Sequence, residues 1–136
     1  MARECDFRIG TANVRMKATE LAQMTRLRVR LAPGVDFGPG KADLLEGIRE
    51  TGSISAAGRR MRMSYKRAWQ LVDELNRLFD APLVEAIKGG PGGGGAALTK
   101  FGENVLARYR RMHAACCRAI ARDAEFLNEH RSSSAD

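Results

Sequence analysis

The 136-residue sequence has few of the residues on which metal centres, disulfide frameworks and histidine-based catalysis depend. Its three cysteines and two histidines show no CxxC or Cys/His spacing typical of zinc sites: Cys5, Cys116, Cys117, His113 and His130. Adjacent cysteines on a helix point about 100° apart, which suits packing better than a disulfide. We therefore expect no metal, no cofactor and no enzymatic activity.

Long apolar segments are also missing. The chain has no run of about 18 apolar residues, so nothing in it predicts a membrane span. Residues 1–20 are too polar for the apolar part of a signal peptide. We expect a cytoplasmic protein without a membrane partner, large enough for one domain with a core of its own.

Basic residues, in contrast, are in excess. The chain has 23 Lys and Arg against 16 Asp and Glu, a formal net charge of +7, which favours an anionic partner. Residues 51–72 contain no acidic residue and five basic ones: Arg59, Arg60, Arg62, Lys66 and Arg67. Because a solvated basic face is the common alternative, these residues indicate nucleic acid only in a suitable fold.

The N-terminal part of the chain predicts little regular structure. Residues 1–24 show no clear periodicity, and we expect a mobile or loosely docked N-terminal extension. Residues 26–32 alternate strictly, which predicts a half-buried strand with its arginines outward and three apolar side chains inward: Leu27, Val29 and Leu31. The prolines and glycines of residues 33–40 predict a turn-rich connector.

Helical signals begin at Lys41. Apolar residues then recur at helical spacing until Gly52, which stands where a C-terminal glycine cap would end the helix. Ser53 is suited to cap a short second helix that runs to about Met61, and Ser64 to cap a third. Two helices with such a tight connection predict a helix-turn-helix.

The third helix is clearly amphipathic. Its apolar side chains cluster on one face: Ala68, Leu71, Val72, Leu75, Leu78 and Phe79. The opposite face carries Lys66, Gln70, Asp73 and Arg77, with Tyr65 and Arg67 on the flanks. Trp69 lies beside this polar face, and both packing and exposure remain open for it.

The segment from Lys88 to Ala96, KGGPGGGGA, contains six glycines among nine residues. A Walker phosphate loop needs Gly-Lys-Ser/Thr running into a helix, and a Rossmann fingerprint needs strand, turn and helix in succession. Neither follows here, and the one long helix after the loop, residues 100–126, is too little for a second domain joined by a hinge. Short strands on both sides predict a β-hairpin tip, or wing, whose backbone can approach DNA phosphates closely.

The segments TGSISAAGRRMRMSYKRAWQLVDELN, PLVE and GGPGGGGAALTKFG occur in that order. They resemble the DNA-binding half of ModE-type molybdate-responsive transcription regulators and, more distantly, the winged N-terminal domains of LysR-type regulators. The resemblance covers about residues 27–120. It implies an α/β, mainly α, winged helix-turn-helix with a long C-terminal dimerisation helix, which binds a palindromic operator in double-stranded DNA as a homodimer.

Charge, outward position and this resemblance together predict the DNA-binding residues: Ser53, Arg59, Arg60, Arg62, Ser64, Tyr65, Lys66, Arg67, Gln70, Lys88, Gly92, Gly93 and Gly94. Apolar residues on two faces of the long helix predict a homodimer formed through it: Val105, Tyr109, Met112, Cys116 and Ile120. The winged and dimerisation domain is expected to span residues 25–126, followed by a disordered tail at 127–136.

The resemblance also implies a C-terminal oxyanion-binding domain in full-length family members. Because this chain ends shortly after the long helix, we expect it to lack molybdate sensing and to depend on a separate effector-sensing protein. The predicted function is a sequence-specific, bacterial-type transcription regulator. A winged-helix scaffold for protein partners and a small phosphate-binding enzyme are the alternatives.

Overall fold

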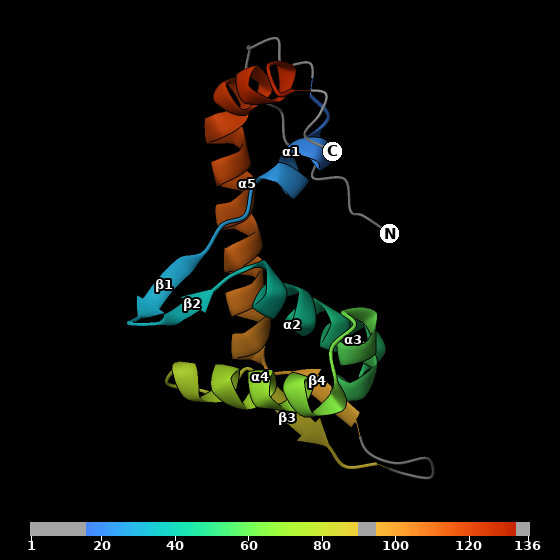
Figure 1. The fold of residues 1–136 in the computed structure, drawn as a ribbon. Coiled ribbons are helices and arrows are strands. Elements are labelled where there is room, and N and C mark those ends of the chain that lie inside the picture. The colour runs from blue at the N-terminus through green and yellow to red at the C-terminus, as the bar shows by residue number, and fades with distance from the viewer. Residues whose placement is uncertain (1–15, 90–94, 133–136) are drawn as a thin grey trace. The chain divides into compact units, whose positions relative to one another are not determined.

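The computed structural model describes residues 16–89 and 95–132. The chain divides into two compact units. The winged unit is Arg28–Tyr109, and the helix-pair unit combines Met1–Leu27 with Arg110–Asp136. Helix α5 (Lys100–Glu129) contributes residues to both units (Figure 1).

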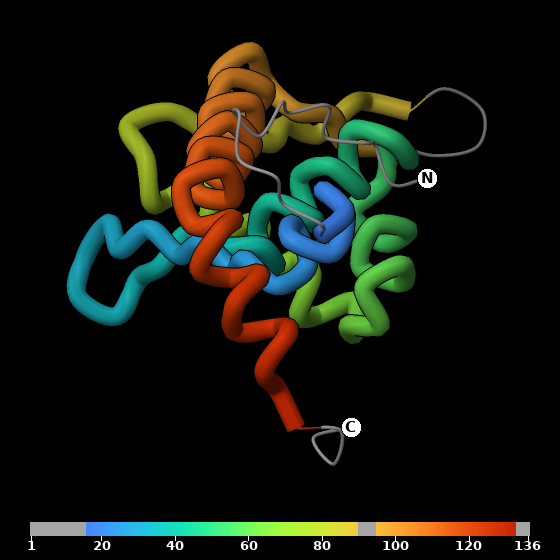
Figure 2. The backbone as a smooth tube through the Cα atoms, turned by 90° about the horizontal axis from the view of Figure 1, so that it is seen from above, coloured from blue at the N-terminus to red at the C-terminus, as the bar shows by residue number. Residues whose placement is uncertain are grey.

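The winged unit is mainly helical, with two small antiparallel hairpins. Along the chain its elements are β1 (Val29–Ala32), β2 (Val35–Phe37), α2 (Pro39–Thr51), α3 (Ile54–Arg60), α4 (Tyr65–Leu78), β3 (Val84–Ile87), β4 (Gly95–Leu98) and the start of α5. The β1–β2 hairpin and the β3–β4 wing lie at opposite sides of this unit (Figures 1 and 2). The predicted winged helix-turn-helix fold is confirmed.

Local capping places the helix boundaries of the helix-turn-helix. Gly52 ends α2 with a φ of 70°, a left-handed conformation that glycine adopts without strain. Ser53 begins α3, since its side chain accepts a hydrogen bond from the N–H of Ala56 at 3.1 Å. Ser64 begins α4 in the same way, with the N–H of Arg67 at 3.1 Å. All three predicted caps are confirmed.

The core of the winged unit depends on close backbone approach between helices. A Cβ added to Gly47 in α2 would lie 3.0 Å from the Cβ of Ala57 in α3, and one added to Gly58 would lie 2.8 Å from the Cβ of Ala68 in α4. Large apolar side chains fill the remaining space and are fully buried: Leu44, Leu45, Ile48, Leu75, Leu83 and Leu106. The three helices are therefore held in one fixed arrangement.

The first hairpin differs from the sequence prediction. Its first strand begins at Val29, and the segment predicted as a connector contains a second strand, β2. The pairing is irregular between Arg30 and Ala32, so Leu31 is 45% exposed and not inward as predicted. Helix α2 also begins earlier than Lys41, at Pro39, because proline at the first helical position has the required φ.

The helix-pair unit contains α1 (Ala18–Met24) and the later part of α5. Its buried residues form one small cluster: Met16, Leu21, Cys117, Ala121 and Ala124. Residues 18–24 form a helix that the sequence analysis did not predict, and its Leu21 is fully buried. Residues 1–15 and 133–136 lie outside the described part, and α5 continues past Phe126 to Glu129.

Candidate nucleic-acid interface

Helix α4 separates its buried and exposed side chains as the sequence predicted. Ala68, Leu71, Val72 and Leu75 face the core. The other face is exposed over the first two turns and carries the predicted DNA-binding residues of this helix: Tyr65, Lys66, Arg67 and Gln70. Trp69 is 44% exposed, so it also belongs to the surface. The result is a polar and aromatic helix face directed away from the core.

The turn before α4 brings three further arginines to the surface. Residues 61–63 form a tight connection, in which the N–H of Met63 donates to the carbonyl oxygen of Gly58 at 3.0 Å. The side chains of Arg59, Arg60 and Arg62 are exposed around this turn. The predicted basic residues therefore flank the N-terminal end of α4.

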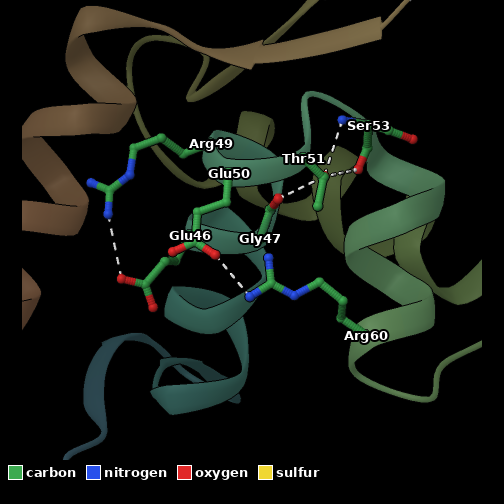
Figure 3. A network of polar contacts seen from close by, with 7 residues as sticks. All are labelled: Glu46, Gly47, Arg49, Glu50, Thr51, Ser53 and Arg60. Atoms are coloured by element: carbon green, nitrogen blue, oxygen red, sulfur yellow. Dashed lines mark hydrogen bonds and ion pairs between the residues drawn. The ribbon is translucent and has the colours of Figure 1, made fainter. Parts of the chain in front are cut away.

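Two of the predicted arginines already have carboxylate partners. Arg60 Nη2 lies 2.8 Å from Glu50 Oε2, and Arg67 Nη1 lies 3.8 Å from Glu74 Oε1 (Figure 3 shows the first pair). The hydrogen bond from Arg60 holds the pKa of Glu50 below its usual value. A DNA phosphate must therefore compete with Glu50 for Arg60.

Thr51 connects the end of α2 to the start of α3. Its hydroxyl donates to the carbonyl oxygen of Gly47 at 2.7 Å and accepts from the N–H of Ser53 at 3.2 Å (Figure 3). Ser53 is half-buried, and its own hydroxyl is occupied as the cap of α3. The hydroxyl oxygen of Ser53 accepts the capping hydrogen bond. The predicted contact to a DNA phosphate would therefore use the hydroxyl hydrogen, which the cap does not need.

The wing is anchored at its base to two helices. The side-chain amide of Asn76 in α4 donates to the carbonyl oxygen of Val84 at 3.0 Å, and its oxygen accepts from the N–H groups of Leu83 and Val84 at 2.9 and 3.0 Å. The N–H of Ala96 donates to the carbonyl oxygen of Gly52 at 2.9 Å. These bonds orient the wing beside α4.

Sequence reasoning missed Asn76. The signal was an amide residue inside a strongly amphipathic helix, where asparagine is a poor helix former unless its side chain has a specific partner. Lys88 is exposed just after β3. The predicted contacts Gly92, Gly93 and Gly94 lie outside the described residues.

A groove of about 510 Å³ separates α4 from the wing. We call it the α4–wing groove; it is lined by Ser53, Ile54, Ser55, Tyr65, Trp69, Val72, Asn76, Val84, Glu85, Ala86, Ile87, Gly95 and Ala96. Tyr65 and Trp69 meet edge to face along it, with ring centroids 6.0 Å apart. Most of the lining is therefore apolar or aromatic.

The predicted dimerisation residues are divided between core and surface. Tyr109 is only 2% exposed, and its ring centroid lies 5.2 Å from that of Phe37. It therefore belongs to the core of the winged unit and not to the predicted dimer surface. Val105 and Cys116 are half-buried, whereas Met112 and Ile120 are 42% and 39% exposed.

Two negative findings concern the described residues only. Within residues 16–89 and 95–132, no group of His, Cys, Asp and Glu side chains is placed to hold a metal ion. In the same part of the chain, no helix combines the length and the apolar character that crossing a membrane requires.

Residues 42–103 match the family described as bacterial regulatory helix-turn-helix protein, lysR family. The chain is 38% identical over 109 residues to the molybdenum transport protein ModE of Azotobacter vinelandii, which covers 77% of this chain and 40% of the relative. It is 42% identical over 95 residues to the molybdenum-pterin-binding protein MopB of Rhodobacter capsulatus, covering 70% of this chain and 35% of the relative.

A third relative is the DNA-binding transcriptional dual regulator ModE of Escherichia coli, 39% identical over 83 residues, 61% of this chain and 32% of the relative. The chain thus spans about two fifths or less of the length of these relatives. The predicted resemblance to ModE-type and LysR-type regulators is confirmed. It favours a DNA-binding regulator over a scaffold for protein partners.

Proposed function

We propose that this chain, whose residues 42–103 belong to the lysR family of bacterial regulatory helix-turn-helix proteins, is a sequence-specific transcriptional regulator. The observation that carries the proposal is the exposed face of α4, with Lys66 and Gln70 opposite the buried stripe. A helix with such a face fits the major groove, where lysine and glutamine side chains hydrogen-bond base edges.

The remaining predicted residues serve the DNA backbone in this proposal. Arg59, Arg60 and Arg62 approach phosphates beside the turn, together with Arg67 and the capping residues Ser53 and Ser64. Lys88 and the glycines of the wing follow the flanking backbone. The function is binding and not catalysis, and it is exercised in the cytoplasm, where bacterial DNA is found.

The proposed active form is a symmetric homodimer. Met112, Cys116, Ile120 and Leu127 recur along one face of α5, and Met112, Ile120 and Leu127 are large apolar side chains with 39–67% of their surface exposed. A second copy of the chain would cover this face. Two-fold symmetry would then space two half-sites of a palindromic operator by one helical turn, about 34–36 Å, or a multiple of it.

The proposal extends to molybdenum-linked genes. Two relatives carry molybdenum in their names, one for transport and one for a molybdenum-pterin. Selection of bound fragments from genomic DNA tests both levels of the proposal, because it yields the operator and the neighbouring genes together. Log affinity for the selected duplex should fall linearly with log salt as phosphate counterions are released. A chain indifferent to duplex DNA would instead be a protein-interaction scaffold.

Substitutions then separate base contacts from backbone contacts. Lys66→Ala and Gln70→Ala should each lower the ratio of specific to non-specific affinity about tenfold, the effect of one lost base contact. Bulky residues in place of Gly93 and Gly94 should weaken specific and non-specific binding by similar factors. The reverse pattern would contradict this assignment of α4 and the wing.

A further inference from the structure

Two aromatic side chains in the α4–wing groove are exposed to solvent, and the stability of the fold does not explain why they are there. Tyr65 is 64% exposed and Trp69 is 44% exposed, although the other large apolar residues of this helix are buried or, for Leu78, half-buried. Ile87, on the wing side of the groove, is 50% exposed. Large aromatic side chains contribute most when a partner removes them from water. The groove therefore has the character of a contact surface.

The charge of the groove restricts what can occupy it. Among the described residues that line it, none is a lysine or an arginine, and Glu85 is the one charged residue. The basic residues of the proposed interface stand outside this lining, on the outward face of α4, at the turn before it and at Lys88 after β3. Ser53, for which a phosphate contact is proposed, lines the groove at the start of α3. Between Tyr65, Trp69 and Ile87 a phosphate group would meet apolar surface, and the carboxylate of Glu85 also lines the groove, so a neutral apolar group is the fitting occupant of that part.

The position of the groove identifies the source of that group. Tyr65 opens α4, and Lys66 and Gln70 alternate with Tyr65 and Trp69 over its first turns. A duplex that places base edges against Lys66 and Gln70 brings its major-groove floor next to the aromatic pair. The base edges there carry hydrogen-bonding groups and one apolar substituent, the C5-methyl group of thymine.

We propose that Tyr65 and Trp69, in the α4–wing groove, bind thymine methyl groups and thereby make thymine a specified base of the operator. This inference rests on the proposed DNA-binding function and deepens it. Residues four apart on a helix are separated by a rise of about 6 Å. If α4 lies along the major groove of the DNA, the two rings would contact thymines one or two base pairs apart.

The test removes the methyl groups and nothing else. In the duplex obtained by selection, each thymidine is replaced in turn by 2′-deoxyuridine, which keeps the base pair and its hydrogen bonds. We expect the affinity to fall about three- to fivefold at one or two positions of each half-site, the effect of burying one methyl group. Substitution at the other thymidines should leave the affinity unchanged.

Variants connect the loss to the two rings. Trp69→Ala and Tyr65→Ala should each abolish the preference for thymidine over deoxyuridine at the position that the ring serves. Tyr65→Phe, which keeps the ring, should preserve it. Gln70→Ala is the control: it should weaken binding to the thymidine duplex and to the deoxyuridine duplex by the same factor. Thermal unfolding checks each variant, and Trp69→Gln, which also removes the ring, replaces Trp69→Ala if the latter does not fold.

Trp69 also supplies a direct signal, because it is the one tryptophan of the chain. Its fluorescence should respond differently to the thymidine duplex and to the duplex with deoxyuridine at the sensitive positions. Two results together would overturn the inference: no replacement of thymidine by deoxyuridine alters the affinity, and Trp69→Ala weakens binding to all sequences equally. The aromatic rings would then contact deoxyribose and not thymine methyl groups. Failure to bind any duplex would instead refute the proposed function itself.

Discussion

The winged unit and the helix-pair unit differ in how completely they bury their apolar surface. The winged unit encloses side chains from four helices and three strands, and glycines allow its helices to approach closely. The helix-pair unit has one small buried cluster around Leu21 and Cys117. Its part of α5 leaves Met112, Ile120, Phe126 and Leu127 exposed. The first unit has a core of its own, whereas the second has apolar surface available for a partner.

The largest expected effect concerns the core of the winged unit. A Cβ at Gly102 would lie 2.1 Å from the carbonyl oxygen of Leu83, a backbone atom that cannot rotate away. Gly102→Ala should therefore lower the free energy of unfolding by about 3 kcal/mol or more, measured by chemical denaturation. Gly40→Ala is the control, since nothing lies within 4 Å of a Cβ there. Equal midpoints for the two variants would contradict the close packing.

The next effect concerns the helix-pair unit. A chain carrying Ile120→Glu and Leu127→Glu should sediment as a monomer at micromolar concentration, whereas the unchanged chain should sediment as a dimer. Affinity for a duplex with two half-sites should fall about a hundredfold, because the half-sites are no longer linked. Arg118→Gln, exposed on the same part of α5, should change neither property. A monomeric unchanged chain would refute the dimer.

A smaller effect is expected at the base of the wing. Asn76→Ala leaves the N–H groups of Leu83 and Val84 without their side-chain acceptor. We expect a loss of about 1–3 kcal/mol in the free energy of unfolding and faster hydrogen exchange at these two amides. Asn76→Asp keeps the acceptor oxygen and should lose less. The dimer should persist in both variants, since the change is confined to the winged unit.

The smallest effect concerns the Arg60–Glu50 pair. Arg60 lowers the pKa of Glu50, so the pair is complete above the usual glutamate pKa of 4.5 and is lost as the pH falls through the lowered value. Glu50→Gln releases Arg60 at neutral pH and should raise the affinity for non-specific duplex about two- to threefold. Fluorescence anisotropy at fixed salt measures it. Glu46→Gln, which removes the same charge beside Arg49, should have no such effect.

Local chemistry made the helix-turn-helix predictable. Gly52, Ser53 and Ser64 determine their helix ends through groups within a few residues, so the sequence contains the whole interaction. The helical spacing of the apolar residues in α4 likewise predicted which face is buried, without knowledge of the elements that pack against it. These helix boundaries also place Arg59, Arg60 and Arg62 around the turn, so the position of these basic residues was predictable too.

Features that depend on distant neighbours were not predictable in the same way. Helix α1 exists because Leu21 packs against α5, far away in the sequence. Strand β2 has only three residues, and the prolines and glycines around it indicated a turn. Tyr109 continues the periodicity of the exposed side of α5, and only the position of Phe37 shows that it is buried.

At Arg62, backbone stability and the proposed DNA contact have opposite requirements. Among the described residues it is the one non-glycine with a positive φ, 56°, a conformation that costs an L-residue about 1–2 kcal/mol. Glycine would relieve this strain but remove a cation from the proposed interface. A chain with Arg62→Gly should therefore melt at a higher temperature and hold DNA less tightly, so optimising this position for folding alone would select against its use in binding.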